Sequence, residues 1–272
     1  MDFLVIPWDV NPEIFRIGNF AVRWYGLLFA SGFVFGYYIL KKIFANEGYG
    51  DATLDRLTVY VAIGTIVGAR LGHCFFYEPA YYLANPVEIL KVWHGGLASH
   101  GAAIGIPLAL WFFVRKEKKP YIWAIDRVVI VVALAGALIR LGNLMNSEIY
   151  GVETTLPWGF VFLRNDETAP KHPTQIYESL AYLITFGVLM WLYWKNRGKQ
   201  KPGLLFGIFL LLVFGFRFFV EYVKEDQVAF EAGMKLNMGQ WLSIPLVLGG
   251  IAMLVWAYRK KPVPVTAAKK KK

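Results

Sequence analysis

Long apolar stretches separated by short polar segments dominate the chain. A helix that spans a bilayer needs about 20 mostly apolar residues. Seven stretches meet this requirement, and we predict a transmembrane helix in each: about 19–40, 57–76, 96–114, 120–145, 175–194, 203–222 and 238–258. The pattern predicts an all-α integral membrane protein, in which residues 1–272 form a single seven-helix domain that ends in a basic tail, 259–272.

The segments between these helices differ strongly in their Lys and Arg content. One set holds 18 of these residues and consists of 41–56, 115–119, 195–202 and 259–272. The alternate set holds 6 and consists of 1–18, 77–95, 146–174 and 223–237. Since short basic loops stay on the cytoplasmic side of a membrane, we expect the N-terminus outside and the C-terminus in the cytoplasm.

The composition agrees with a membrane protein and excludes several other classes. The chain is 57% hydrophobic and 18% charged, with a mean hydropathy of +0.43, whereas soluble domains are about 45–50% apolar and about 25% charged. An aromatic content of 17% excludes a disordered chain. The single cysteine, Cys74, excludes a disulfide framework and a cysteine-based zinc site, and we expect it to pack in the core. The net charge of +10 does not indicate nucleic-acid binding, because most of the basic residues lie in the predicted cytoplasmic segments.

Glycines recur at a spacing of four residues in several predicted helices. This spacing places them on one helix face, where they let neighbouring backbones approach closely. The pairs and triplets are Gly32/Gly36, Gly64/Gly68/Gly72, Gly101/Gly105 and Gly203/Gly207. They predict a tightly packed helix bundle and carry no chemistry of their own.

Five arginines remain inside the predicted spans: Arg23, Arg70, Arg127, Arg140 and Arg217. An arginine at the bilayer centre costs roughly 2.5–3.5 kcal/mol even on insertion scales, so these residues need a reason to be there. In the predicted orientation, all except Arg127 lie in the outer half of the bilayer. Arg127 follows Asp126 near the cytoplasmic side, where the pair is expected to be a structural anchor.

Other hydrogen-bonding side chains gather at the same outer depth. They are Tyr25, His73, His100, Asn143, Asn146, Glu178 and Glu221. Together with the arginines they predict a polar, cationic cavity that opens towards the outer leaflet.

Two of the arginines also have purely structural interpretations. Arg217 and Glu221 are four residues apart and could form a helix-surface ion pair, and Arg70 could extend to the outer interface. His100 differs from an ordinary core histidine because it follows the glycine-rich stretch WHGGLAS at 93–99.

Arginines at outer-leaflet depth are suited to bind phospholipid phosphate, because the planar guanidinium matches phosphate bidentately. They would also stabilise negative charge on a phosphate leaving group. A histidine beside them could take a proton from an incoming nucleophile. The carboxylates are scattered and no metal-ligand spacing occurs, so we expect neither a metal nor a cofactor.

The segment 140–151 reads RLGNLMNSEIYG. It resembles the hallmark of the bacterial prolipoprotein diacylglyceryl transferases, G-R-x-G-N-F-x-N-x-E-x-x-G. Six further matches follow the order of that family along nearly the whole chain, at 23–26, 68–72, 93–101, 172–178, 217–221 and 238–240.

The resemblance implies transfer of the diacylglyceryl group of phosphatidylglycerol to the lipobox cysteine of a prolipoprotein, the first step of lipoprotein maturation. A thioether forms and glycerol phosphate leaves. It implies a multi-pass protein of the bacterial inner membrane whose site faces the periplasm. The partners it implies are phosphatidylglycerol, the prolipoprotein signal peptide and the lipid bilayer, with no nucleic acid.

The resemblance also implies roles for individual residues. The catalytic group would comprise His100, Tyr25, Arg140 and Arg217, with His100 and Tyr25 as candidates for deprotonating the thiol. The phosphatidylglycerol site would comprise Arg70, Arg140, Asn143, Asn146, Glu148, Gly151, Arg217 and Glu221. Within it, Arg140 and Arg217 would grip the phosphate, while Glu148 and Glu221 would orient them.

Four positions depart from the family pattern. Ile139 replaces a glycine and Leu144 a phenylalanine, while Val213 and Lys224 stand where a tyrosine and an arginine are usual. Two other functions use the same residues. An anion or lipid transporter predicts polar residues across the whole bilayer depth, and a passive lipid- or peptide-binding protein would need the arginines but not His100.

Overall fold

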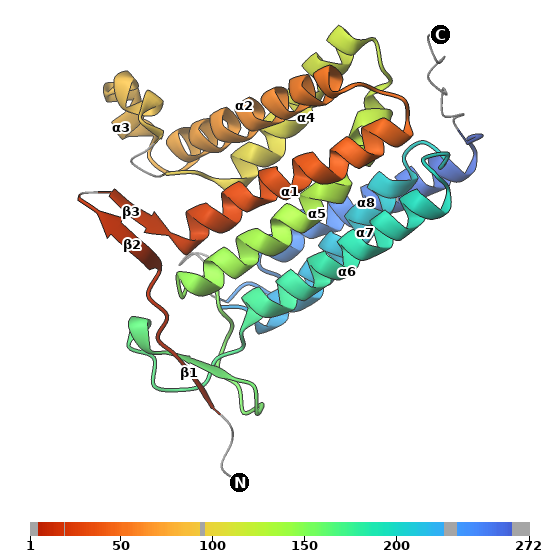
Figure 1. Cartoon of the computed structure of the whole chain (residues 1–272). Helices are drawn as coiled ribbons and strands as arrows, with labels where there is room; N and C mark the ends of the chain where they lie inside the picture. Colours follow the sequence, from red (N-terminus) through yellow and green to blue (C-terminus); the bar gives the residue numbers. More distant parts are fainter. Residues whose placement is uncertain (1–4, 19, 93–95, 226–232, 263–272) are drawn as a thin grey trace. The chain divides into compact units, whose positions relative to one another are not determined.

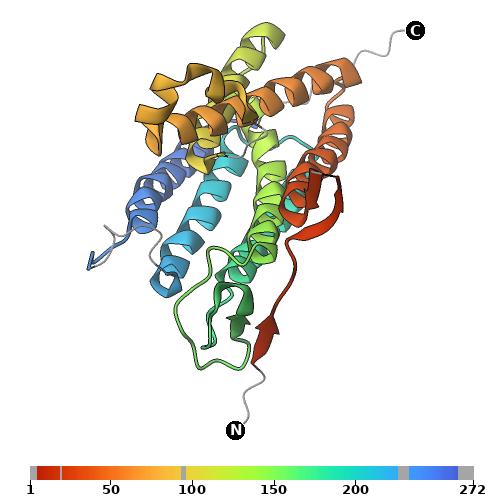
Figure 2. The same ribbon diagram turned by 90° about the vertical axis from the view of Figure 1, so that its left-hand side faces the viewer.

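The computed structural model describes residues 5–18, 20–92, 96–225 and 233–262, and it is mostly helical (Figure 1, and turned by 90° in Figure 2). Its long helices are α1 (Trp24–Asn46), α2 (Asp51–Phe76), α4 (Ser99–Glu117), α5 (Tyr121–Met145), α6 (Thr174–Lys195), α7 (Leu204–Val220) and α8 (Met238–Tyr258). The shorter ones are α3 (Pro79–Ala84) and the 3-10 turns η1 (Pro86–Leu90), η3 (Leu163–Asn165) and η4 (Glu221–Val223). Each of the seven predicted apolar stretches therefore lies largely on one long helix.

Six helices in the described part of the chain are long and apolar enough to cross a membrane. They are α1, α2, α5, α6, α7 together with η4, and α8. Helix α4 has 19 residues but is not among them. Its ends explain this, because Ser99 and His100 open the helix and Arg115, Lys116 and Glu117 close it.

The prediction of a purely helical protein is incomplete, because the described residues also form short strands. Strand β1 (Ile6–Trp8) pairs in parallel with β4 (Phe160–Phe162), and β2 (Glu13–Ile17) pairs antiparallel with β3 (Phe20–Arg23). Gly18 has a φ of +58°, a conformation open to glycine, and it permits the turn between β2 and β3. The first helix consequently begins at Trp24 rather than near residue 19.

The described residues divide into two compact units. The first contains those up to Ile39 and those from Val128 onward, and the second contains Leu40–Arg127. Helices α1 and α5 run through both. Each unit is described below by itself.

Close helix packing characterises the first unit, in which α5, α6 and α7 run side by side (Figure 1). A Cβ atom on Gly32 of α1 would lie 3.2 Å from Cβ of Ala135 on α5. The hydroxyl of Ser179 on α6 donates to the carbonyl of Ala137, at 3.1 Å. The predicted role of the glycines in close packing is thus confirmed for α1.

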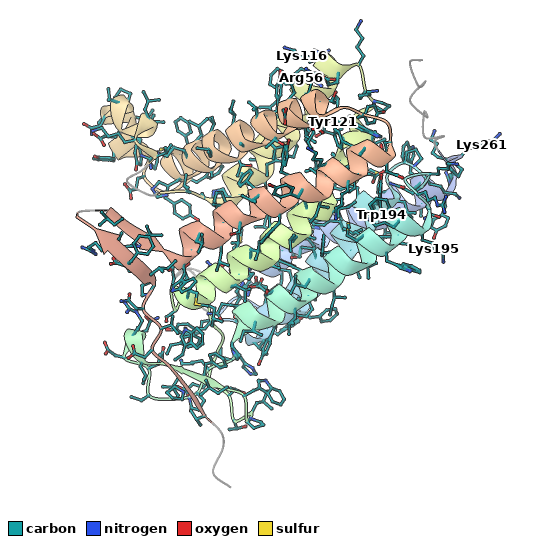
Figure 3. All side chains as sticks on the ribbon, viewed as in Figure 1. Arg56, Lys116, Tyr121, Trp194, Lys195 and Lys261 are labelled. Atoms are coloured by element: carbon teal, nitrogen blue, oxygen red, sulfur yellow. The ribbon has the colours of Figure 1, made fainter. Side chains whose placement is uncertain are left out.

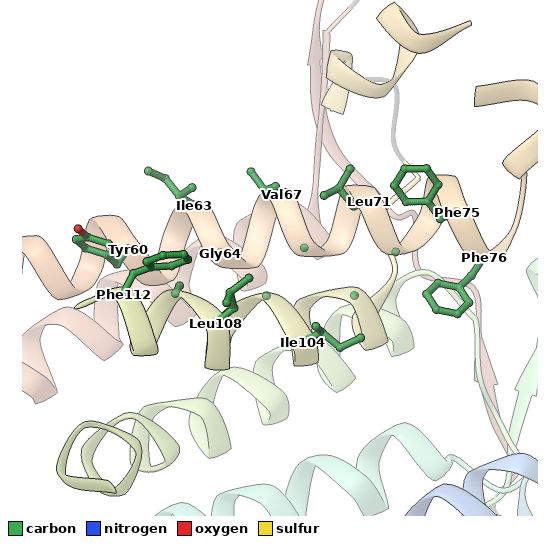
Figure 4. A pocket seen from close by; sticks show the side chains of 15 residues that line it. Tyr60, Ile63, Gly64, Val67, Leu71, Phe75, Phe76, Ile104, Leu108 and Phe112 are labelled. Atoms are coloured by element: carbon green, nitrogen blue, oxygen red, sulfur yellow. The ribbon is translucent and has the colours of Figure 1, made fainter. Parts of the chain in front are cut away.

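In the second unit, α2 and α4 touch through their backbones. A Cβ on Gly101 would lie 2.1 Å from the carbonyl oxygen of Gly68, and one on Gly105 would lie 2.1 Å from that of Gly64. An apolar cavity of about 500 Å³ runs beside this contact (Figure 4). Apart from Tyr60, its side chains are hydrocarbon or absent, so it offers no group for proton or phosphate chemistry.

The predicted cytoplasmic anchor is also in the second unit. Arg127 Nε lies 3.0 Å from Glu47 Oε1, and Trp123 Nε1 donates to the other oxygen of Glu47, at 2.7 Å. All three residues are buried. The structural interpretation of Arg127 is therefore confirmed, although its partner is Glu47, which the sequence did not indicate.

Basic residues gather at one end of each unit (Figure 3). In the first unit, Lys195 at the end of α6 lies at the same end as Lys261, which follows α8. In the second unit, Arg56 and Lys116 lie together, and Arg56 is paired with Glu117 at 2.6 Å. The tail beyond residue 262 lies outside the described residues.

Candidate active site

Arg140 is held near the C-terminal end of α5 by partners from two elements. Its Nη1 donates to Asn143 Oδ1 at 3.1 Å, one turn further along the same helix. Its Nε lies 3.0 Å from Oε2 of Glu178, a fully buried carboxylate on α6. The guanidinium is thereby fixed from two sides, while 14% of the arginine side chain stays exposed.

The loop after α5 is organised around Glu148. Its Oε1 accepts hydrogen bonds from Asn143 Nδ2 at 2.7 Å and Asn146 Nδ2 at 3.2 Å. The Glu148 carbonyl accepts from Gln175 Nε2 of α6 at 2.8 Å. Glu148 therefore acts on Arg140 through Asn143. The side-chain oxygen of Asn143 accepts from Arg140, and its side-chain nitrogen donates to Glu148.

Backbone strain flanks Glu148 on both sides. Ser147 and Ile149 adopt φ angles of +53° and +62°, a left-handed conformation that is unfavourable for residues other than glycine and especially for a branched one. The hydrogen bonds to Glu148 hold this loop in place. Strain of this kind is common where a loop must present particular groups to a ligand.

Gly151 ends the hallmark segment where two chain segments meet. Its N–H donates to the carbonyl of His172 at 2.8 Å, and it forms an isolated antiparallel bridge with Lys224. A Cβ atom at this position would lie 2.1 Å from the Val223 carbonyl oxygen. Only glycine allows this approach, so the structure gives Gly151 a spatial role.

Arg217 and Glu221 form the ion pair that their spacing predicts. Arg217 Nε lies 3.3 Å from Glu221 Oε1, and the carboxylate is buried. The contact is not aligned as a hydrogen bond, and Arg217 Nε is a buried donor without a hydrogen-bond acceptor among the described residues. That N–H is available to an oxygen of a ligand.

Lys224 lies between the two carboxylates that pair with the arginines. Its Nζ is 3.3 Å from Glu221 Oε1 and 3.5 Å from Glu178 Oε2. Burial lowers the pKa of this lysine, against the opposing effect of Glu178 and Glu221. Sequence reasoning had treated Lys224 only as a departure from the family pattern.

The start of α8 closes the far side of Glu221. Asn237 caps the helix by accepting the backbone N–H of Gln240 at 2.9 Å, and its Nδ2 donates to Glu221 Oε2 at 3.1 Å. A Cβ on Gly239 would lie 2.4 Å from Cδ of Glu221. The segment 238–240 thus leaves just enough room for this carboxylate.

Tyr25 lies against the hallmark helix at the beginning of α1. A Cβ on Gly142 would be 2.8 Å from Cδ2 of the tyrosine ring. The half-buried phenol interacts electrostatically with Glu148 and Arg140. The structure therefore brings Tyr25 to the same site as the hallmark residues.

Arg70, in the second unit, binds backbone carbonyls. Its Nε donates to Ile89 at 3.0 Å, its Nη2 to Glu88 at 2.6 Å and its Nη1 to Gly96 at 3.3 Å. These bonds fasten the segment before α4 to α2. Arg70 is also buried, so its guanidinium is covered by this segment. Its phosphate contact stays a prediction.

His100 stands in the first turn of α4, also in the second unit. Its ring packs edge-on against Phe76, with centroids 5.0 Å apart. Its Nε2 is buried and has no hydrogen-bond partner among the described residues. Of the glycine-rich stretch before it, Trp93, His94 and Gly95 lie outside the described residues, while Gly96 has a φ of +69° and packs against the His73 ring. Cys74 is fully buried, as expected.

The first unit therefore brings together most of the predicted site: Tyr25, Arg140, Asn143, Asn146, Glu148, Gly151, Arg217 and Glu221. Arg70 and His100 belong to the second unit, so the action of His100 beside the arginines stays a prediction. Sequence reasoning missed that Glu178 and Lys224 link the two arginines. The sequence did mark both positions. Glu178 lies at the outer depth of its predicted helix, and Lys224 departs from the family pattern.

Two further residues that depart from the family pattern pack in small apolar clusters of the first unit. Val213 contacts Ala137 and Tyr182, and Leu144 contacts Phe160 and Phe162. Neither brings a polar group to the site. Nothing in the structure explains Ile139.

Comparisons with known proteins show the family of the chain. A family model described as prolipoprotein diacylglyceryl transferase matches residues 12–256. A protein of Tolumonas auensis named phosphatidylglycerol–prolipoprotein diacylglyceryl transferase is 49% identical over 93% of this chain and 98% of its own length. Proteins of the same name from Chloroherpeton thalassium and Porphyromonas gingivalis are 46% and 47% identical, over 96% and 95% of this chain and 98% and 96% of their own lengths. The chain belongs to the prolipoprotein diacylglyceryl transferase family.

Proposed function

We propose that this protein transfers the diacylglyceryl group of phosphatidylglycerol to the lipobox cysteine of a prolipoprotein. The observation that carries the proposal is the pair of arginines, Arg140 and Arg217, each held by a buried carboxylate. Such fixed guanidinium groups match the oxygens of a phosphodiester. The name of the relatives supports the same substrates.

In the proposed step, the thiolate sulfur of the acceptor attacks the glyceryl carbon that carries the phosphate. A C–S bond forms while the C–O bond breaks, and the bonding electron pair leaves on the oxygen of glycerol phosphate. Arg140 and Arg217 stabilise the negative charge that develops there. His100 takes the thiol proton and later releases it to water.

The remaining site residues would bind and orient the lipid. Asn143, Asn146 and Glu148 hold the hallmark loop, and Tyr25 lies against it as a second candidate for proton transfer. We propose Arg70 as a further lipid contact near the segment that leads to His100.

The proposed arrangement in the membrane is seven spans within a single domain. Helix α4 would be the seventh span, because its 19 residues are enough for the roughly 17–25 that a crossing needs. The Lys and Arg distribution favours an external N-terminus and a cytoplasmic C-terminus. The protein would lie in the bacterial inner membrane with its site towards the periplasm.

A transfer assay tests the proposal. Purified protein is incubated with phosphatidylglycerol and a peptide that contains a lipobox cysteine, and the thioether-linked product is sought by mass spectrometry. We expect a peptide whose mass increases by one diacylglyceryl group. Absence of this product, under conditions in which a relative produces it, would overturn the proposal.

A transporter for anions or lipids is the alternative that uses the same arginines. It requires polar groups through the depth of the bilayer, whereas the charged network of the first unit gathers at one end of α5, α6 and α7. Lipid or phosphate flux in liposomes without any acceptor peptide would favour the transporter.

A further inference from the structure

Lys224 is almost completely buried, and its ammonium group lies between two buried carboxylates. Its side chain is 3% exposed, and the side chains of its partners Glu178 and Glu221 are 0% and 4% exposed. A buried lysine is unfavourable unless carboxylates compensate its charge. Here one ammonium group contacts two of them.

Each of these carboxylates also pairs with an arginine. Glu178 pairs with Arg140 at 3.0 Å, and Glu221 pairs with Arg217 at 3.3 Å. Charges therefore alternate along a chain of five side chains, from arginine through glutamate, lysine and glutamate to the second arginine. Lys224 is the link that joins the α5–α6 pair to the α7–η4 pair.

The charge balance of this chain depends on the lysine. Two carboxylates neutralise two arginines, so the four residues that remain without Lys224 would carry no net charge. With it, the five ion-paired side chains have one positive charge in excess, whereas Glu148 reaches Arg140 only through the side-chain amide of Asn143. Opposite charges attract strongly where water is excluded, so the excess favours binding of one negative charge, which is the charge of a phosphodiester.

The backbone also fixes the position of Lys224. Gly151 forms an antiparallel bridge with it, and the N–H of Val152 donates to the carbonyl of Val223 at 3.0 Å. The missing side chain of Gly151 allows this pairing, since a Cβ would lie 2.1 Å from the Val223 carbonyl. The hallmark segment therefore contributes to the site twice, through Arg140 and through the placement of the lysine.

We propose that Lys224 is a positioning residue of the transfer reaction. It holds both carboxylates in place and supplies the excess positive charge with which the two arginines bind a phosphodiester monoanion. This inference rests on the proposed function, because it assigns a role within that reaction. The lysine itself acts through its neighbours and does not take part in proton transfer.

Two substitutions test this role. Lys224→Met removes the charge and keeps much of the volume, whereas Lys224→Arg keeps the charge. We expect Lys224→Met to raise KM for phosphatidylglycerol at least tenfold with a smaller change in kcat, and Lys224→Arg to stay within about threefold of the wild-type values. Loss of activity in both variants, or full activity in Lys224→Met, would overturn the proposal.

Lys171→Met is the matched control. Lys171 is also buried and also bridges two carboxylates, Glu167 at 3.3 Å and Glu225 at 2.7 Å. These are not the carboxylates that pair with Arg140 and Arg217. We expect its KM to stay within twofold of wild type. An equal rise of KM in Lys171→Met would show that loss of any buried lysine is sufficient, and would contradict the proposal.

A binding measurement separates this inference from the proposed function. Thermal stabilisation of each purified variant is recorded with phosphatidylglycerol and with zwitterionic phosphatidylcholine, without acceptor peptide. We expect a preference for phosphatidylglycerol in the wild type and in Lys224→Arg, and its loss in Lys224→Met. If the wild type transfers nothing but keeps this preference, the transfer function fails while the role of Lys224 in anion binding stands. Equal preference in all three variants would refute that role.

Discussion

Arg140 and Arg217 have different chemical surroundings from the surface arginines of the same chain. Each is paired with a buried carboxylate, so its guanidinium plane is fixed before a ligand arrives. Arg16 on β2 also pairs with a glutamate, Glu13, but its side chain is 58% exposed. An exposed pair of that kind contributes little free energy and fixes little geometry.

A conservative change at Arg140 should therefore be as harmful as a drastic one. We expect Arg140→Lys to lower kcat roughly 100-fold, because an ammonium group cannot hold Glu178 and Asn143 and still present two N–H groups to phosphate. The transfer assay measures this, with Arg16→Lys as the control that should keep wild-type activity. Near-normal turnover of Arg140→Lys would mean that a point charge is enough.

Gly151 should tolerate no side chain at all. We expect Gly151→Ala to lower kcat/KM at least tenfold, because its methyl group would collide with the Val223 carbonyl and displace the backbone of Lys224. Gly187→Ala on α6 is the control, since nothing lies within 4 Å of its Cβ position. Comparable activity of these two variants would contradict the spatial role of Gly151.

The half-buried His172 should make stability depend on pH. Burial lowers its pKa in the folded protein, so the unfolded chain binds its proton first as the pH falls. The stabilising contribution of the neutral ring is therefore complete above its ordinary pKa of about 6.5 and is lost as the pH falls from there towards the folded value. We expect the apparent thermal midpoint of the wild type to fall slightly more than that of His172→Gln between pH 7 and pH 5. Parallel curves for the two proteins would disprove this.

At the scale of residues, the sequence indicated which side chains are polar and at what depth, because charged groups in apolar stretches are conspicuous. It could not indicate their partners. The link between Glu178, on α6, and Arg140, on α5, depends on how two helices rotate about their axes. Likewise, Lys224 reaches both carboxylates only because a backbone bridge to Gly151 places it there.

At the scale of elements, α2 and α4 approach most closely where glycine backbones meet, at Gly64, Gly68, Gly101 and Gly105. We expect Gly101→Ala to lower stability by about 1–3 kcal/mol through overpacking, since its Cβ would lie 2.1 Å from the Gly68 carbonyl. Gly215→Ala on α7, where nothing lies within 4 Å, should be neutral or slightly stabilising. Apparent melting temperatures in detergent compare the two, and equal values would contradict close packing.

Helices were more predictable than strands for a physical reason. A spanning helix satisfies its backbone hydrogen bonds within one apolar stretch, so its signal is local. Strand β1 instead pairs with β4, more than 150 positions further along the chain, and neither segment has a long alternating pattern. Strand β3 replaces the first residues of the predicted helix for a different, local reason, because the turn at Gly18 pairs this short segment with β2.

At the scale of the whole molecule, the basic residues fall into two groups. Most of the excess of basic residues lies in segments predicted to face the cytoplasm, where anionic lipid attracts them. A much smaller set lies within the apolar stretches and forms the ion-pair network of the site. We expect the first to determine the orientation in the membrane, and the second to bind the substrate.

Helix α4 decides the topology, because an odd number of spans places the two ends of the chain on opposite sides. Lys91 precedes α4, while Lys116 is exposed in its last turn. Replacing the buried Cys74 by alanine provides a background without cysteine, in which Lys91→Cys and Lys116→Cys are single reporters.

We expect a membrane-impermeant thiol reagent to label Lys91→Cys in intact spheroplasts, and Lys116→Cys only after the membrane is opened. This result follows if α4 crosses the bilayer with its basic end inside, as the excess of Lys and Arg in 115–119 favours. Transfer activity of both variants verifies that they are folded. Labelling of both cysteines from the same side would mean that α4 does not cross, and with six spans both ends of the chain would lie on one side of the membrane.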